Sequence, residues 1–321
     1  MVPEVSIIGV DVSSRELVVA HVGDAHPVQT IANRYNDIHA WLNQLPAGTI
    51  IGMEATGRYH QCLADDAVAV GHTVYVINPK QLADYAKGVG RRGKTDPIDA
   101  RVIARFLDRE RSGLHPYTPA TPLQRTLRDL LSQRAGLVHH RNAIEQNLRA
   151  TSATSAALKR ARNKTLQSLA ALIAEIDSEL KRLFAAHAAL DTRRKHLQSI
   201  TGIGFLNSVA LAHRFDRTEF ANSDAVVAAY GLDPRPRDSG NKTGRRYLTK
   251  QGNAEDRRLI YLAAQSAVKT RLFKPAYQAL LARGLATTQA IIIIARKLLR
   301  IAFAVWKSNT PFDPSRIAMH A

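Results

Sequence analysis

The stretches EVSIIGVDVS (4–13), RELVVAHVG (15–23) and HPVQTIANRY (26–35) decide the fold of the N-terminal part of the chain. Each run is apolar or alternates apolar with polar residues, and breakers separate the runs, which is the pattern of short strands. The runs GTIIGMEAT (48–56) and HTVYVINP (72–79) predict two more strands, each preceded by a helical pattern. We therefore expect an α/β domain in which a three-strand meander precedes strand–helix–strand units.

The chain is strongly basic, with 45 Lys and Arg against 27 Asp and Glu, a formal net charge of +18 and a pI near 10.4. This excess favours nucleic acid as a partner and disfavours a membrane. The longest apolar stretch, residues 290–306, is interrupted by Arg296, Lys297 and Arg300, so it predicts a buried helix. The single cysteine, Cys62, excludes an internal disulfide, and together with the lack of a signal-peptide pattern it predicts a cytoplasmic protein.

A length of 321 residues allows two or three domains. We expect the α/β domain over 1–115, a helical arm over 116–199 and a mostly helical C-terminal domain over 200–321. The C-terminal part contains one irregular insert rich in Gly, Pro and Arg, which predicts a loop or a loose hairpin.

The second half of the expected arm carries a heptad pattern. Residues recur at spacings of three and four, with one polar member, at Leu166, Leu169, Ile173, Ile176, Leu180, Leu183, His187 and Leu190. A seam of this length faces another helix. The partner is either the segment 123–151, which would give an intramolecular hairpin, or a second protomer, which would give a dimerisation arm. The pattern leaves both alternatives open.

Four carboxylates are placed in the sequence so that their side chains could meet in one metal site. Asp11 and Glu54 lie late in two apolar strand patterns, while Asp96 and Asp99 are three residues apart at the start of an expected helix over 96–110, with Asp96 as its N-cap. If the two strands are neighbours and the helix packs over them, the four acids meet on one face. Singly, each acid can be a cap, a strand end or a surface charge. Jointly, in a basic chain, they favour a site for Mg²⁺ that supports phosphoryl transfer.

The succession GVDVS, GMEATGRYH and KTDPIDARVIA resembles the DEDD-type transposases and recombinases, which include Piv/MooV-type DNA invertases and the transposases of the "one-ten" insertion-sequence family. The resemblance spans nearly the whole chain. It implies a ribonuclease H-like (RuvC-like) N-terminal domain, a long helical coiled-coil arm and a mostly α C-terminal transposase domain. It further implies that Asp11, Glu54, Asp96 and Asp99 are catalytic and bind Mg²⁺, which Mn²⁺ can replace.

The irregular insert contains PRPRDSGNKTGRRYLTKQGN (234–253), with Ser239 beside Gly240. From the residues alone, Ser239 is a turn residue. Six Lys or Arg against one Asp between Arg235 and Lys250 would attract a phosphate. The resemblance implies that Ser239 is a catalytic nucleophile that forms a covalent phosphoserine link to cleaved DNA. The expected nucleic-acid contacts in this loop are Arg235, Arg237, Arg245, Arg246 and Lys250.

Two further segments are candidates for nucleic-acid binding. The run SITGIGFLNSVALA (199–212) resembles a helix-hairpin-helix element, in which Gly202 and Gly204 would let backbone N–H groups approach phosphates. A plain tight turn between helices is the alternative. Beside the acidic helix, the basic residues Arg91, Arg92 and Lys94 are candidates for a nucleic-acid groove.

We thus expect a DNA transposase or site-specific recombinase of a mobile element that cuts and rejoins DNA. Its expected partners are donor and target DNA, further copies of itself as a homodimer or homotetramer and, as the resemblance implies, a structured guide (bridge) RNA. The alternatives are a Piv-like DNA invertase, a junction-resolving nuclease that uses water as the nucleophile, and a non-catalytic nucleic-acid-binding protein.

Overall fold

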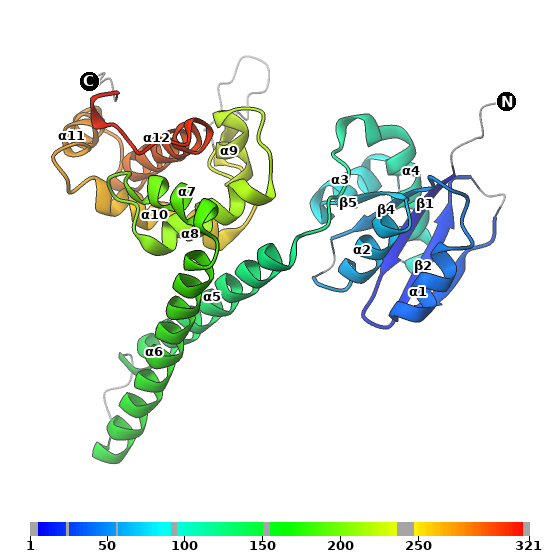
Figure 1. Cartoon of the computed structure of the whole chain (residues 1–321), viewed down its shortest axis with the longest axis horizontal. Helices are drawn as coiled ribbons and strands as arrows, with labels where there is room; N and C mark the ends of the chain where they lie inside the picture. Colours follow the sequence, from blue (N-terminus) through cyan, green and yellow to red (C-terminus); the bar gives the residue numbers. More distant parts are fainter. Residues whose placement is uncertain are drawn as a thin grey trace. The chain divides into compact units, whose positions relative to one another are not determined.

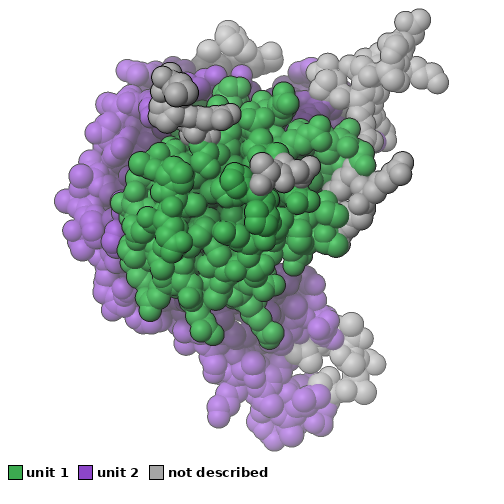
Figure 2. Space-filling view, turned by 90° about the vertical axis from the view of Figure 1, so that its right-hand side faces the viewer, with its two compact units in different colours: residues 1–119 green, residues 120–321 purple. Residues whose placement is uncertain are grey.

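The computed structural model describes residues 6–23, 26–55, 57–90, 95–149, 155–235 and 247–316. The chain divides into two compact units, residues 1–119 and residues 120–321 (Figure 2). The acidic residues singled out above lie in unit 1, and the serine loop lies in unit 2.

Unit 1 is built on a five-stranded mixed sheet in the order β3-β2-β1-β4-β5. Strands β1, β2 and β3 form the expected antiparallel meander, and β4 and β5 continue the sheet parallel to β1. The strands span Ile7–Val12, Glu16–His21, Gln29–Ala32, Ile50–Glu54 and Thr73–Ile77, in the order β1 to β5. The prediction of an α/β domain is confirmed.

Helices cover both faces of this sheet (Figure 1). On one face, α1 (Tyr35–Leu42) and α2 (Gln61–Ala69) pack against the alternate apolar side chains of β1, such as Ile8 and Val10. On the other face lie α3 (Pro79–Gly88) and α4 (Asp96–Glu110). A short 3₁₀ turn (Arg111–Gly113) follows α4.

Two glycines allow α4 to lie directly on the strands. Gly9 of β1 and Gly52 of β4 are register partners. A Cβ at Gly9 would stand 2.2 Å from the carbonyl oxygen of Ala100, and one at Gly52 would stand 2.9 Å from Cδ2 of Leu107. Real Cβ atoms do not approach backbone atoms so closely, so the backbone of α4 restricts Gly9 to glycine, whereas a Cβ at Gly52 would require the Leu107 side chain to shift.

Unit 2 is mostly helical and its core surrounds α12 (Thr287–Ser308), which is the buried helix expected over 290–306. Within the described ranges, none of the helices has the length and apolarity that a membrane crossing requires. The remaining elements of unit 2 are α5 (Pro122–Arg149), α6 (Ala156–Ala185), α7 (Ala188–Gln198), α8 (Phe205–Arg217), α9 (Ser223–Ala229), β6 (Pro234–Arg235), β7 (Tyr247–Leu248), α10 (Ala254–Ala267), α11 (Lys274–Ala282) and a 3₁₀ turn (Pro314–Arg316).

Helices α5 and α6 pack on each other and extend away from the rest of unit 2 (Figure 1). The seam residues Ile173, Ile176 and Leu180 are buried. Arg134 of α5 donates to Asp177 of α6 at 2.6 Å from its Nε. The hairpin alternative therefore occurs within one chain. The seam does not continue to Leu190 on a single helix, because α6 ends at Ala185 and His187 adopts a non-helical conformation before α7.

We expect Gly9→Ala to destabilise unit 1, because the added methyl group meets the backbone of α4 and not a side chain that can move. Overpacking of this kind costs about 1–3 kcal/mol. Gly88→Ala is the matched control, since a Cβ there meets nothing within 4 Å and alanine favours the α3 helix. Thermal unfolding of the full chain followed by circular dichroism measures the difference. Equal melting of the Gly9→Ala protein and the wild type would contradict the packing described.

Candidate functional site

Asp11 and Glu54 lie on the face of the sheet that α4 covers. Asp11 follows Gly9 by two residues in β1, and Glu54 follows Gly52 by two residues in β4. Because alternate strand residues share a face, both carboxylates project from the same face as these glycines. Both side chains are half-buried. Since β1 and β4 are parallel neighbours, the two acids lie side by side near the carboxyl ends of these strands.

The first turns of α4 carry the other two acids. Asp96 is the first residue of the helix and is exposed, while Asp99 is half-buried. The predicted N-cap was wrong by one residue: Thr95 occupies that position in an extended conformation, and Asp96 follows it inside the helix. Both carboxylates lie in the first turn of α4, at the positive end of the helix dipole.

The packing of α4 on the sheet shows where its two acids lie relative to Asp11. Ala100, directly after Asp99, is buried against Val18 and Ala20 of β2. Val18 is the register partner of Asp11. The start of α4 therefore lies over the part of the sheet where Asp11 stands, so all four acids belong to one side of unit 1.

The chemistry of these four side chains fits a hard divalent cation, because Mg²⁺ and Mn²⁺ prefer carboxylate oxygens. In the part of the chain that the structure describes, no three or more His, Cys, Asp or Glu side chains are arranged to hold a metal ion. The four acids share a face without forming a closed coordination shell. The basic candidates Arg91, Arg92 and Lys94, which precede α4, lie outside the described residues.

The serine loop is described only at its two ends. Ser239, Arg237, Arg245 and Arg246 lie outside the described residues. At the ends, Arg235 of β6 pairs with Tyr247 of β7. The Arg235 side chain is 66% exposed, and Lys250 is exposed with a positive φ of 51°. The structure thus presents two of the five expected basic residues to solvent at the base of the loop.

The two glycines of the expected helix-hairpin-helix have different environments. Gly202 has a φ of +94°, and a Cβ there would stand 2.7 Å from the carbonyl oxygen of Ala263 in α10. Packing alone therefore accounts for Gly202. Gly204 is the N-cap of α8 and has open space around it. Of the pair, Gly204 is the position where a phosphate could approach the start of a helix.

A cleft of about 490 Å³ between α5, α8 and α10, lined by charged and apolar side chains, was not predicted from the sequence. Burial lowers the pKa of His213 in this cleft to about 4. Burial also raises the pKa of Asp256, and Arg214 opposes this shift. The lining residues come from three helices that are far apart in the chain, so no short motif marks them.

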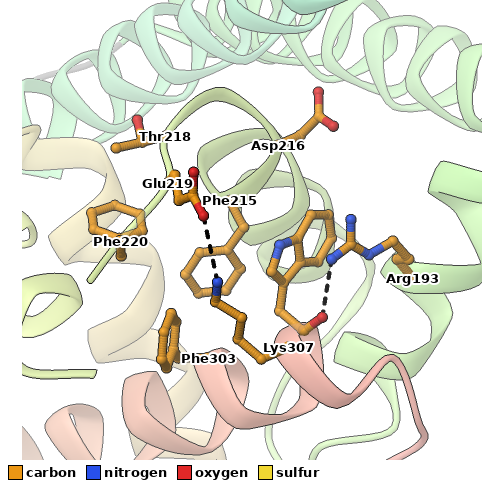
Figure 3. A pocket seen from close by; sticks show the side chains of 9 residues that line it. Arg193, Phe215, Asp216, Thr218, Glu219, Phe220, Phe303 and Lys307 are labelled. Carbon is orange, nitrogen blue, oxygen red and sulfur yellow. Dashed lines mark hydrogen bonds and ion pairs between the residues drawn. The ribbon is translucent and has the colours of Figure 1, made fainter. Parts of the chain in front are cut away.

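A second, smaller cavity of about 270 Å³ is lined by aromatic and charged side chains of unit 2 (Figure 3). The Arg193 guanidinium stacks 3.5 Å from the centroid of the Trp306 ring and donates to the Trp306 carbonyl at 3.0 Å. Lys307 pairs with Glu219 at 3.8 Å. These contacts join α7 and α12 to the segment that follows α8. The side chains that line the cavity therefore have a structural role, which is to hold these elements together.

Comparisons with known proteins cover most of the chain. A family model for DEDD transposases of the IS110 type, described as "Transposase", matches residues 8–153, and a model described as "Transposase IS116/IS110/IS902 family" matches residues 194–278. The pilin gene-inverting protein of Moraxella lacunata is 30% identical over 270 residues, which cover 81% of each chain. The transposase for insertion sequence element IS1328 of Yersinia enterocolitica is 25% identical over 346 residues, covering 97% of this chain and 99% of the relative.

We expect His213 to make stability depend on pH. Its pKa of about 4 in the folded chain lies below the 6.5 of a free histidine, so the unfolded chain binds more protons between these values. Stability should therefore fall as the pH drops from 6.5 towards 4, by at most about 3 kcal/mol from this group. Urea unfolding at pH 7 and pH 5 measures the change.

His213→Asn should flatten this dependence, whereas His140→Asn on α5 should leave it in place, because His140 is exposed. The raised pKa of Asp256 has the opposite effect on stability as the pH falls. Because Asp256 is present in both variants, its effect largely cancels when they are compared. An unchanged pH dependence in the His213→Asn protein would show that His213 is not the titrating group.

Proposed function

Because the chain belongs to the IS110 family of transposases, we propose that it cuts and rejoins DNA with a Mg²⁺-dependent carboxylate site and a serine nucleophile. The observation that carries the carboxylate part is the shared face of unit 1. Asp11 and Glu54 lie near the carboxyl ends of two adjacent parallel strands on the side covered by α4, and Asp96 and Asp99 lie in the first turn of that helix. The mixed sheet, with its meander and parallel continuation, supports a ribonuclease H-like (RuvC-like) domain.

In the proposed reaction, the Ser239 hydroxyl attacks the scissile phosphorus. A phosphoserine ester forms, the bond from phosphorus to one deoxyribose oxygen breaks, and the serine proton passes to the departing oxygen. A deoxyribose hydroxyl of the same or another strand then attacks the phosphoserine, which restores Ser239 and joins DNA without outside energy. Arg235 and Lys250 at the base of the loop bind the DNA backbone next to the scissile phosphate. When bound, Mg²⁺ would supply positive charge that stabilises the pentavalent transition state, and Asp11, Glu54, Asp96 and Asp99 would bind and orient the ion.

The proposed assembly contains two or four copies. Within one chain, α5 covers the seam of α6, yet Leu158 and Leu172 remain about half exposed, at 51% and 50%. These two leucines are fourteen residues apart, which is two heptads, so they lie on one face of α6. That face supports pairing with a hairpin of another copy. Such pairing would let the serine loop of one subunit reach the carboxylates of another.

The proposed partners are donor and target DNA together with a structured guide RNA. The net charge of +18 supports binding to polyanions of this kind. A DNA invertase is the second candidate function. The relative whose printed name is "Pilin gene-inverting protein" favours it, since its match covers 81% of this chain. Both functions use the same proposed chemistry and differ in the arrangement of the DNA sites.

We expect Ser239→Ala to abolish detergent-resistant protein–DNA adducts on plasmid DNA supplied with the flanking RNA of the gene. Thr243→Ala, which removes a hydroxyl from the same loop, should retain the adducts. Because catalysis needs the cation, EDTA or Asp11→Asn should reduce adduct formation by at least roughly a hundredfold. Gel electrophoresis after denaturation measures the adducts.

Adducts that persist in the Ser239→Ala protein would contradict the serine mechanism. If the wild type nicks DNA without adducts, and Asp11→Asn abolishes the nicking, water is the nucleophile and the chain is a junction-resolving nuclease. If Asp11→Asn changes no activity, the carboxylates are not catalytic.

A further inference from the structure

An exposed tyrosine lies at the base of the serine loop. The Tyr247 side chain belongs to β7 and is 58% exposed. Its register partner across the two-stranded ladder is Arg235 of β6, whose side chain is also exposed. Residues directly opposite in an antiparallel pair have Cβ atoms about 5 Å apart. The ring and the guanidinium are therefore neighbours on one outward surface.

The ladder that presents this pair is held firmly to unit 2. The Thr249 amide donates to the Asp233 carbonyl at 3.1 Å, and the Thr249 hydroxyl also donates to the Asp233 carboxylate. Leu248, next to Tyr247, packs against the core around α12. Alternation along the strand then sends Tyr247 outward.

The turn beneath the ladder is equally close-packed. The Lys250 amide donates to the Gly231 carbonyl at 3.1 Å. Gly231 has a φ of +64°, and a Cβ there would stand 2.1 Å from the carbonyl oxygen of Gln251. A rigid support of this kind lets an exposed ring bind a ligand without first losing conformational freedom.

A hollow of about 350 Å³ lies at this surface and is lined by Arg235, Tyr247, Leu248 and Thr249. Its volume falls at the lower end of the range of small-ligand sites, roughly 300–1,000 Å³. It offers an aromatic face and a cation that can bind a phosphate bidentately. A single nucleotide presents the complementary groups, namely a base with a π-face and an anionic phosphate.

We propose that Tyr247 and Arg235 form a nucleotide clamp that holds one unpaired DNA nucleotide beside the scissile phosphate. The base stacks on the Tyr247 ring and its phosphate pairs with the Arg235 guanidinium. The assignment to DNA rests on the proposed function, because Ser239 follows Arg235 by four residues. The covalent chain thus keeps the two Cα atoms within roughly 14 Å of each other.

The clamp gives Tyr247 a role in strand separation. An aromatic side chain that accepts an unpaired base stabilises a locally melted duplex, and stacking tolerates any base sequence. The clamp therefore contributes to DNA opening near the cleavage point without selecting the target, which leaves selection to other contacts.

The test measures binding in a Ser239→Ala background, so that it does not depend on the nucleophile. A fluorescent DNA duplex with a short unpaired stretch is titrated with full-length protein, and anisotropy gives the Kd. We expect Tyr247→Ala to raise the Kd roughly tenfold, because stacking is worth about that factor per base or more. Tyr247→Phe keeps the ring and should bind as the parent does. Tyr35→Ala removes a tyrosine of equal exposure, 58%, from unit 1 and should have no effect.

The substrate provides a second control. When the unpaired bases are replaced by abasic sites, the difference between the parent and Tyr247→Ala should vanish. Arg235→Gln should lower the slope of log affinity against log salt concentration by about one.

Equal affinity of Tyr247→Ala and its parent would overturn the clamp, and so would a loss of affinity that persists on the abasic substrate. A loss seen only with single-stranded RNA of the same sequence would overturn the assignment to DNA. None of these outcomes changes the adduct assay, so a failed clamp and a failed serine mechanism are distinguishable.

Discussion

The direct packing of α4 on the two glycine positions of β1 and β4 is the contact on which the proposed catalytic face depends. Gly9 and Gly52 leave space that the backbone of α4 and the side chain of Leu107 occupy. Ala100 and Ala104 therefore lie against the sheet, with 0% and 1% of their surface exposed. This contact places the start of the helix, with its two acids and its positive dipole end, over the strand ends that carry Asp11 and Glu54. A bulkier residue at Gly9 would meet the backbone of α4 and shift the helix that carries two of the acids.

The proposed chemistry uses residues from both units. The carboxylates lie on a sheet whose opposite face is covered by α1 and α2, whereas the two described ends of the serine loop form the β6–β7 ladder, which packs on the core around α12. Each part is therefore held by an independent hydrophobic core. This division is compatible with the proposed composite site, in which the carboxylates and the serine loop come from different copies. The α5–α6 hairpin, with Leu158 and Leu172 exposed, would give the proposed assembly a surface for contact between copies.

Strong local patterns predicted much of this structure. The meander, the two parallel strands, the bounds of α4 and the burial of α12 all follow from apolar periodicity, which reports on one element at a time. The predictions failed where two neighbouring residues could both serve as the N-cap, and where the structure depends on contacts between residues far apart in the sequence. Thr95 and Asp96 are both good N-caps, and pattern alone does not choose between them. The heptad continued in the sequence to Leu190, yet the chain bends at His187. The cleft beside His213 and the roles of Gly9 and Gly202 depend on tertiary packing, which no local pattern contains.

The proposed site requires the strand acids and the helix acids to hold the same metal ion, and a double-mutant cycle tests this most directly. Mn²⁺ binding to full-length protein is followed by electron paramagnetic resonance for the wild type, Asp11→Asn, Asp99→Asn and the double variant. If Asp11 and Asp99 share one ion, each single change weakens binding, and the double variant binds more tightly than the sum of the single effects implies. If the two effects simply add, or if either variant binds Mn²⁺ as the wild type does, the acids do not form one site and the account is contradicted.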